Sequence, residues 1–204
     1  MTDFASEYKR RHDAFLRDIA GRLCDHVQEL LRDQCNIDRV SARAKDPEHF
    51  AKKAEGLNEN GTLKYSAPFT EMQDLLGVRV VVFYKSDVAP IDAVIQRYFR
   101  PIEDRELVPD NEWKFGYFGR HLVLPVPLDV VPESVPTDEV PRFFELQIKT
   151  LFQHAWSEAE HDIGYKAPRE LTTQQTRQLA FTAAQAWGAD EIFDQLQKEL
   201  LADR

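Results

Sequence analysis

The sequence has few cysteines and no long apolar run. Its 204 residues include two cysteines, Cys24 and Cys35, without the paired spacing of a zinc site or a disulfide framework. No apolar segment approaches the roughly 20 residues that a membrane span needs. The N-terminus also lacks the apolar core of a signal peptide. These absences argue against a membrane protein and a disulfide-stabilised secreted module, and they predict a cytoplasmic protein.

Glycine is also scarce, and none of the eight glycines forms a P-loop or dinucleotide-binding signature. The net charge of -9 argues against a general nucleic-acid coat protein, because neutralisation of phosphates drives that kind of binding. The segment 39–64 is locally different, since its basic residues outnumber its acidic ones. This segment suits a small polyanion such as a nucleotide. The basic residues are Arg39, Arg43, Lys45, Lys52, Lys53 and Lys64.

Hydrophobic periodicity predicts helices and strands in alternation. Apolar residues at helical spacing predict a first helix over 4–34 and a last helix near the C-terminus. Shorter helices are predicted at 70–76, 87–100 and 151–163, and the strands at 37–45, 78–83, 103–108, 121–128 and 142–149. The proline-spaced acidic segment 129–141 is predicted to be an exposed loop. The fold class is therefore α/β (α+β), with a mixed sheet of about five strands flanked by helices.

The segment Asp74-Leu-Leu-Gly-Val-Arg79 places a carboxylate and a guanidinium at the start of a buried strand. Two interpretations stand side by side for these six residues. The charges can be solvated neighbours of a helix-ending glycine. Alternatively, Asp74 holds a hard cation while Arg79 contacts the base or phosphates of a nucleotide.

A second polar set lies on one predicted strand, where Glu145, Gln147 and Lys149 share a face. This pattern fits a solvated face or the wall of a cleft. The turn that follows Gly116 exposes Tyr117 and His121, which either cover the edge of the core or contact a base and a phosphate.

A third polar set, His154, Glu158 and His161, follows helical spacing. A carboxylate-bridged metal bundle would need a second Glu-x-x-His and further glutamates, which are missing. We therefore interpret these residues as a polar helix face beside a cleft.

Taken in chain order, these segments resemble the synthetase domain of the RelA/SpoT family. The resemblance covers about residues 37–166. Five segments in the same order make chance an improbable explanation. They are Arg43-Ala-Lys45 with Lys53, Asp74 to Arg79, Gly116-Tyr117 with His121, Glu145 to Thr150, and Gln153-His-Ala-Trp156 through Glu160-His161 to Tyr165-Lys166.

The resemblance implies a nucleotidyltransferase-like fold in a single domain over residues 1–204. An N-terminal helix (1–36) would precede a catalytic core (37–166) and a C-terminal helix (167–204). The implied reaction transfers pyrophosphate from ATP to the 3′-hydroxyl of GDP or GTP and releases AMP, which makes the protein a small alarmone synthetase. The implied cofactor is Mg²⁺.

The resemblance also implies roles for individual residues. On the ATP side, Arg43 and Arg79 would sandwich the adenine, and Lys45 and Lys53 would hold the phosphates. Asp74 would ligate Mg²⁺, and Glu145 would share the metal or accept the proton of the attacking hydroxyl. On the acceptor side, the implied residues are Tyr117 on the base, with His121, Gln147, Lys149 and His154 nearby.

Departures from the family pattern fall on the acceptor side. Phe115 stands where long family members carry an asparagine that reads guanine, and Trp113 stands where a basic residue is frequent. These departures keep two alternatives open: a toxin-type member that modifies the 3′ end of tRNA or an adenine nucleotide, and a non-catalytic nucleotide sensor. Both carboxylates are present, which favours catalysis. Small family members often form homo-oligomers, so the resemblance also allows a homo-oligomer, with no membrane partner.

Overall fold

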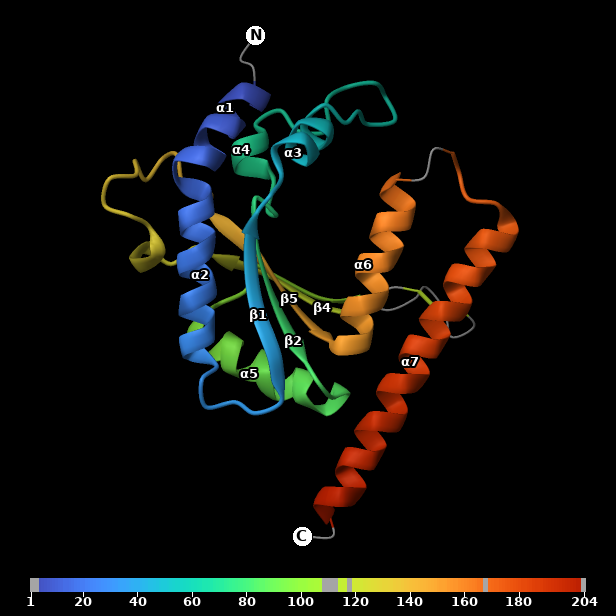
Figure 1. Cartoon of the computed structure of the whole chain (residues 1–204). Coiled ribbons are helices and arrows are strands. Elements are labelled where there is room, and N and C mark those ends of the chain that lie inside the picture. Colours follow the sequence, from blue (N-terminus) through green and yellow to red (C-terminus); the bar gives the residue numbers. More distant parts are fainter. Residues whose placement is uncertain (1–3, 108–113, 117–118, 167–168, 203–204) are drawn as a thin grey trace.

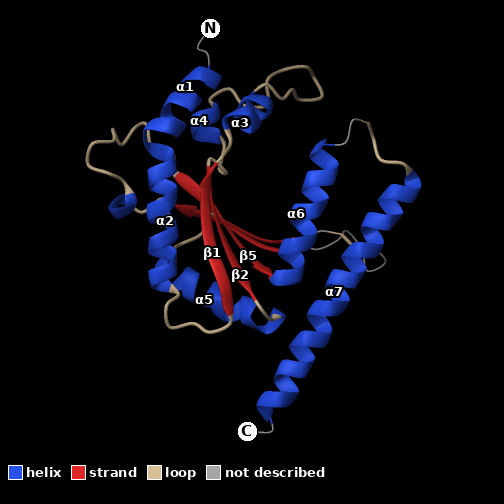
Figure 2. Ribbon diagram, in the orientation of Figure 1, coloured by secondary structure: helices blue, strands red, loops and turns tan. Residues whose placement is uncertain are grey.

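Five strands form one mixed sheet in the computed structural model, which describes residues 4–107, 114–116, 119–166 and 169–202. The strand order is β1-β2-β5-β4-β3. β2 and β5 run parallel, and the other neighbouring strands run antiparallel (Figure 2). This arrangement confirms the predicted mixed five-stranded sheet with flanking helices. The strands are β1 (Ile37–Ala44), β2 (Leu76–Val82), β3 (Glu103–Leu107), β4 (Gly119–Pro125) and β5 (Phe143–Thr150).

Helices cover both faces of this sheet, with α2 and α5 on one side and α6 and α7 on the other (Figure 1). A π-helical turn at His12–Leu16 joins α1 to α2, so the first helix is continuous from Phe4 to Leu30. No helix among the described residues is long and apolar enough to cross a membrane. The helices are α1 (Phe4–Arg11), α2 (Arg17–Leu30), α3 (Pro47–Ala54), α4 (Pro68–Glu71), α5 (Val88–Tyr98), α6 (Leu151–Lys166) and α7 (Thr173–Ala202).

Burial of one face of β5 fixes the direction of its polar residues. Phe144, Leu146 and Ile148 are fully buried in the core. Because side chains alternate along a strand, the residues between them point to the opposite face, toward α6. A shift of one residue in the pairing of β5 would bury the polar set instead. The hydrophobic core therefore sets the orientation of the candidate site.

Two local predictions are wrong. The short helix predicted at 70–76 is α4, which ends at Glu71, and Leu76 already belongs to β2. Gly77 therefore lies inside a strand, because burial of Leu76 and Val78 on the core side favours extended backbone there. The loop 129–141 is not wholly exposed, since Val130 is buried and other valines of the loop pack against the core.

Tyr8 connects the first helix to the residues at the end of β1 and to α3. Its ring is fully buried and stacks on Phe50 of α3, with ring centroids 3.9 Å apart. Its hydroxyl donates a hydrogen bond of 2.8 Å to the backbone oxygen of Lys45. A buried carbonyl without such a partner costs free energy. Tyr8 therefore holds the backbone at the end of β1 in place.

We expect Tyr8→Phe to lower the free energy of unfolding by about 1 kcal/mol, because the ring keeps its packing while the carbonyl of Lys45 loses its donor. Urea denaturation measures the change. Tyr98→Phe is the matched control, because Tyr98 is exposed and should change stability by less than about 0.5 kcal/mol. Equal urea midpoints for the two variants would contradict the role of the Tyr8 hydroxyl.

Candidate active site

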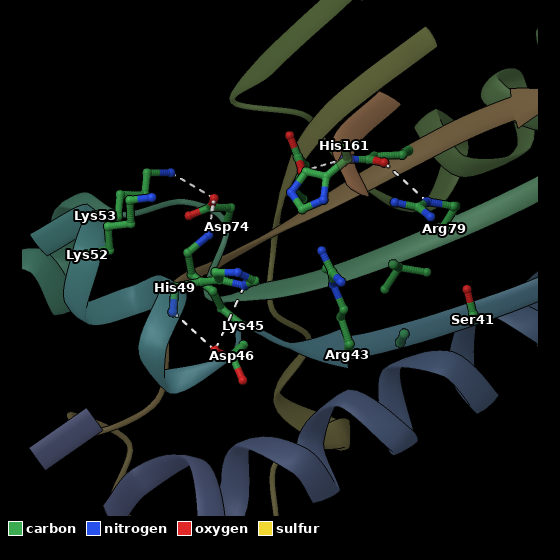
Figure 3. Close-up of a pocket in the computed structure, with 15 residues that line it drawn as sticks. Ser41, Arg43, Lys45, Asp46, His49, Lys52, Lys53, Asp74, Arg79 and His161 are labelled. Atoms are coloured by element: carbon green, nitrogen blue, oxygen red, sulfur yellow. Dashed lines mark hydrogen bonds and ion pairs between the residues drawn. The ribbon is translucent and has the colours of Figure 1, made fainter. Parts of the chain in front are cut away.

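A cavity of about 440 Å³ opens beside the strands β1, β2 and β5 (Figure 3). The helices α3 and α6 contribute the remaining walls through His49 and His161. All the residues predicted for the ATP side line this cavity, together with both predicted carboxylates and one residue predicted for the acceptor side. They are Arg43, Lys45, Lys53, Asp74, Arg79, Glu145 and Gln147.

Two lysines hydrogen-bond to Asp74, which lies shortly before the start of β2. Its Oδ2 accepts hydrogen bonds from Lys45 Nζ at 2.9 Å and from Lys53 Nζ at 2.7 Å. Burial raises the pKa of Asp74, but the hydrogen bonds from the two lysines outweigh it, and the pKa lies below its usual value. Asp74 is therefore ionised at neutral pH.

The start of α3 places Lys53 in this cluster. The carboxylate of Asp46 accepts hydrogen bonds from the backbone N–H groups of Glu48 and His49, and Pro47 occupies the first turn. This cap fixes where α3 begins. Lys53 then lies in the last turn of the helix, facing Asp74.

The two arginines predicted to hold the adenine lie on the same face of adjacent strands. Arg43 pairs with Gly77 and Ser41 pairs with Arg79 in the register of β1 and β2, so the two arginines are diagonal neighbours. Figure 3 shows both side chains among the residues that line the cavity. This placement fits a flat ligand between two guanidinium groups.

Arg79 is fixed by three partners. Its Nε donates to Gln147 Oε1 at 3.3 Å, and its terminal nitrogen lies 2.5 Å from Glu158 Oε1. The same nitrogen lies 3.2 Å from Nδ1 of His154. Two residues of the predicted polar face of α6 therefore serve to orient an arginine of the cavity.

Glu145 has a hydrogen-bond partner on each carboxylate oxygen. His121 Nδ1 lies 2.9 Å from Oε1, and Gln147 Nε2 donates to Oε2 at 2.8 Å. Burial raises the pKa of Glu145, but the hydrogen bond with His121 and that from Gln147 help to bring the pKa below its usual value. The carboxylate is thus ionised at neutral pH and can accept a proton.

A second cavity of about 310 Å³ shares part of its lining with the first, including both carboxylates. Lys53, Asp74 and Glu145 line both cavities, whereas His121 and Arg105 line only the second. Two ligands placed in these cavities would meet at Asp74 and Glu145. This arrangement suits a transfer of a group from one bound molecule to another.

The remaining predicted residues lie elsewhere. Tyr117 falls outside the described residues. Lys149 lines neither cavity; it is 2% exposed, and its Nζ donates to Ser157 Oγ of α6 at 2.9 Å. His154 also lines neither cavity and contacts Arg79. Phe115 is partly exposed, and its ring centroid lies 5.8 Å from that of Trp187 on α7.

His161 was predicted to lie beside a cleft, but sequence reasoning missed His49, which lines the same cavity. The rings of His49 and His161 lie 6.3 Å apart at 88°, so α3 and α6 approach each other across the cavity. The available signal was the spacing of His49 and Lys53, which are four residues apart on a capped helix and therefore share a face.

The residues present fit a bound Mg²⁺. Asp74 Oδ1 is buried and has no hydrogen-bond partner, so this carboxylate has an oxygen left over that could ligate a cation. Among the described residues no group of three or more His, Cys, Asp or Glu side chains could enclose a metal ion. Mg²⁺ commonly takes one or two carboxylates and completes its coordination with water and substrate phosphates. The pair Asp74 and Glu145 matches that requirement.

Comparison with known proteins identifies the family. The family model described as "Region found in RelA / SpoT proteins" matches residues 42–170. This match spans more than half of the chain, which therefore belongs to the RelA/SpoT family.

Proteins of known function and structure resemble this chain in sequence or in fold. The GTP pyrophosphokinase YjbM of Bacillus subtilis (strain 168) is 24% identical over 179 residues, covering 85% of this chain and 78% of its own. YwaC, a GTP pyrophosphokinase of the same strain, is 24% identical, and the match covers 98% of this chain and 93% of YwaC. The crystal structure of small alarmone synthetase 1 from B. subtilis matches with a TM-score of 0.70 at 21% identity. The match covers 98% of this chain and 96% of that protein.

Lys149 predicts a pH dependence of stability. Burial lowers its pKa from 10.5 to about 7, so the unfolded chain binds more protons than the folded chain between these pH values. Stability contributed by this group therefore rises with pH across that window, by at most about 1.4 kcal/mol per pH unit. We expect Lys149→Met to remove this slope. Urea denaturation at pH 7 and pH 9.5 measures how the free energy of unfolding changes with pH in the variant and the wild type. The same change in both proteins would contradict the prediction.

Proposed function

We propose that this protein transfers the β,γ-pyrophosphate of ATP to the 3′-hydroxyl of GDP or GTP, releasing AMP and forming (p)ppGpp. The observation that carries the proposal is the pair of cavities that meet at Asp74 and Glu145. The curated relatives are GTP pyrophosphokinases. Structures of the B. subtilis small alarmone synthetase 1 contain its product pppGpp or AMPCPP, which supports a nucleotide in each cavity.

The first cavity is the proposed ATP site. Arg43 and Arg79 hold the adenine between their guanidinium planes, which stack on aromatic rings. Lys45 and Lys53 bind the phosphates and offset the negative charge that develops on the transferred group and on the departing AMP. Phosphoryl transfer depends mainly on such positioning and charge neutralisation, so the protein needs no covalent intermediate.

Glu145 is the proposed proton acceptor. The acceptor nucleotide occupies the second cavity, with its 3′-hydroxyl at the boundary between the cavities. The ionised carboxylate takes the hydroxyl proton as the oxygen attacks the β-phosphorus of ATP and the bond to the α-phosphate oxygen breaks. His121 and Gln147 keep the carboxylate oriented for this step.

Mg²⁺ is the proposed cofactor, which Asp74 and Glu145 would hold. When bound, the ion supplies a positive charge that neutralises phosphate oxygens. Asp74 contributes its buried, unpartnered Oδ1 while Oδ2 stays with the lysines.

The first helix favours a nucleotide over tRNA as the acceptor. A tRNA-modifying protein would present unpaired basic residues outside the active site. On α1 and α2 four of the five lysines and arginines, all except Arg17, are instead paired with acidic residues: Lys9 with Asp13, Arg10 and Arg11 with Glu7, and Arg22 with Asp18. This pairing leaves little basic surface for a polyanion there.

Incubation with γ-labelled ATP and separate acceptors tests the function. We expect label to appear in GDP or GTP, with AMP released in equal amount. Parallel reactions contain ADP, ATP or bulk tRNA. Label in tRNA or in an adenine nucleotide alone would overturn the guanine assignment. Binding of AMPCPP without labelling of any acceptor would indicate a sensor and overturn the enzymatic assignment.

We expect Asp74→Asn to reduce pyrophosphate transfer to below about a tenth of wild type, a barrier increase above about 1.4 kcal/mol. The amide keeps the shape of the side chain but lacks the charge that binds Mg²⁺ and two lysines. AMP release measures the effect, and a cooperative thermal transition shows that the variant is folded. Asp18→Asn on the exposed face of α2 is the control. Higher residual activity would refute the metal assignment.

A further inference from the structure

Gln147 contacts both an arginine of the proposed ATP site and the proposed proton acceptor. Its Oε1 accepts from Arg79 Nε at 3.3 Å, and its Nε2 donates to Glu145 Oε2 at 2.8 Å. Arg79 lines the first cavity only, whereas Glu145 lines both. The resemblance placed Gln147 on the acceptor side, but in the structure it lines the first cavity, between these two residues.

The chemistry of its neighbours permits one orientation of the amide. Arg79 has only N–H donors, and the ionised Glu145 has only acceptors. A flipped amide would set donor against donor and acceptor against acceptor. A carboxylate at this position would repel Glu145, and an apolar side chain would satisfy neither neighbour. The amide is therefore matched to a cation on one side and an anion on the other.

We propose that Gln147 is a positioning residue that aligns the adenine-binding guanidinium of Arg79 with the proton-accepting carboxylate of Glu145. The inference rests on the proposed function. The Oε1 contact, together with Glu158 and His154, keeps Arg79 in place against the ATP base. The Nε2 contact occupies one lone pair of Glu145 Oε2 and, opposite His121 on Oε1, restricts rotation of the carboxylate.

The two contacts have separable consequences. The contact with Arg79 acts on binding of ATP, because Arg79 contacts only the first ligand. The contact with Glu145 acts on the transfer step, because proton removal occurs there. Gln147→Glu keeps an acceptor for Arg79 and removes the donor to Glu145. Gln147→Met has a similar length and removes both contacts.

The test compares the affinity for AMPCPP, measured by calorimetry, with kcat for transfer to GDP. For Gln147→Glu we expect a Kd for AMPCPP within about threefold of wild type and a kcat reduced by about tenfold or more, the loss expected for a charge-assisted hydrogen bond. For Gln147→Met we expect both a Kd raised about fivefold or more and a kcat reduced as strongly.

Gln195→Glu is the matched control, because Gln195 on the exposed face of α7 also donates to a glutamate, Glu199, at 2.7 Å. It should keep wild-type Kd and kcat. Equal changes in Kd for the two Gln147 variants, or an unchanged kcat in Gln147→Glu, would overturn the positioning role. Failure of the proposed function has a different signature: the wild type itself would transfer no pyrophosphate. The AMPCPP measurements need no turnover and would still test the contact with Arg79.

Discussion

The half-buried cluster of Asp74, Lys45 and Lys53 is the interaction on which the site depends. It joins the end of β1, the last turn of α3 and a residue that lies two positions before β2. Charges are expensive to bury unless they are paired. Here two positive charges share one carboxylate, so a net positive charge remains in a chain of net charge -9. The arginines of β1 and β2 add to it. A polyanion bound in the cavity would complete the pairing, which explains why the surplus is tolerated.

The polar face of β5 was predictable from the sequence. Which of its polar residues line a cavity was not. Glu145, Gln147 and Lys149 share a face because Phe144, Leu146 and Ile148 fill the core, and a period of two is readable in a sequence. Which of the three reaches a cavity depends on α6. This helix begins directly after β5, and Ser157 covers Lys149. Local pattern carries no information on where a helix will lie across a sheet.

The partners of Arg79 also could not be predicted from local sequence pattern, because they lie far away along the chain. His154 and Glu158 are recognisable as a helical face, but their contact with an arginine 75 and 79 residues earlier depends on packing of α6 against β2. Strand positions were predicted to within about three residues, and the β-branched run that became β2 was the clearest of these signals. The helix predicted at 70–76 was wrong because short apolar segments do not distinguish a helix from a strand.

The position of the first helix bears on how this protein can be shortened. The family match begins at residue 42, which would suggest that a fragment from there onward is a sufficient catalytic unit. Yet Leu16, Ile19, Leu23 and Val27 are buried against the sheet. Tyr8 also hydrogen-bonds to the backbone carbonyl of Lys45, whose side chain binds Asp74. A fragment cut at the family boundary would lose residues 37–41 of β1 and expose one face of β2 to water. For cloning and for gene fusion alike, the unit that folds together is therefore larger than the segment that the family model matches.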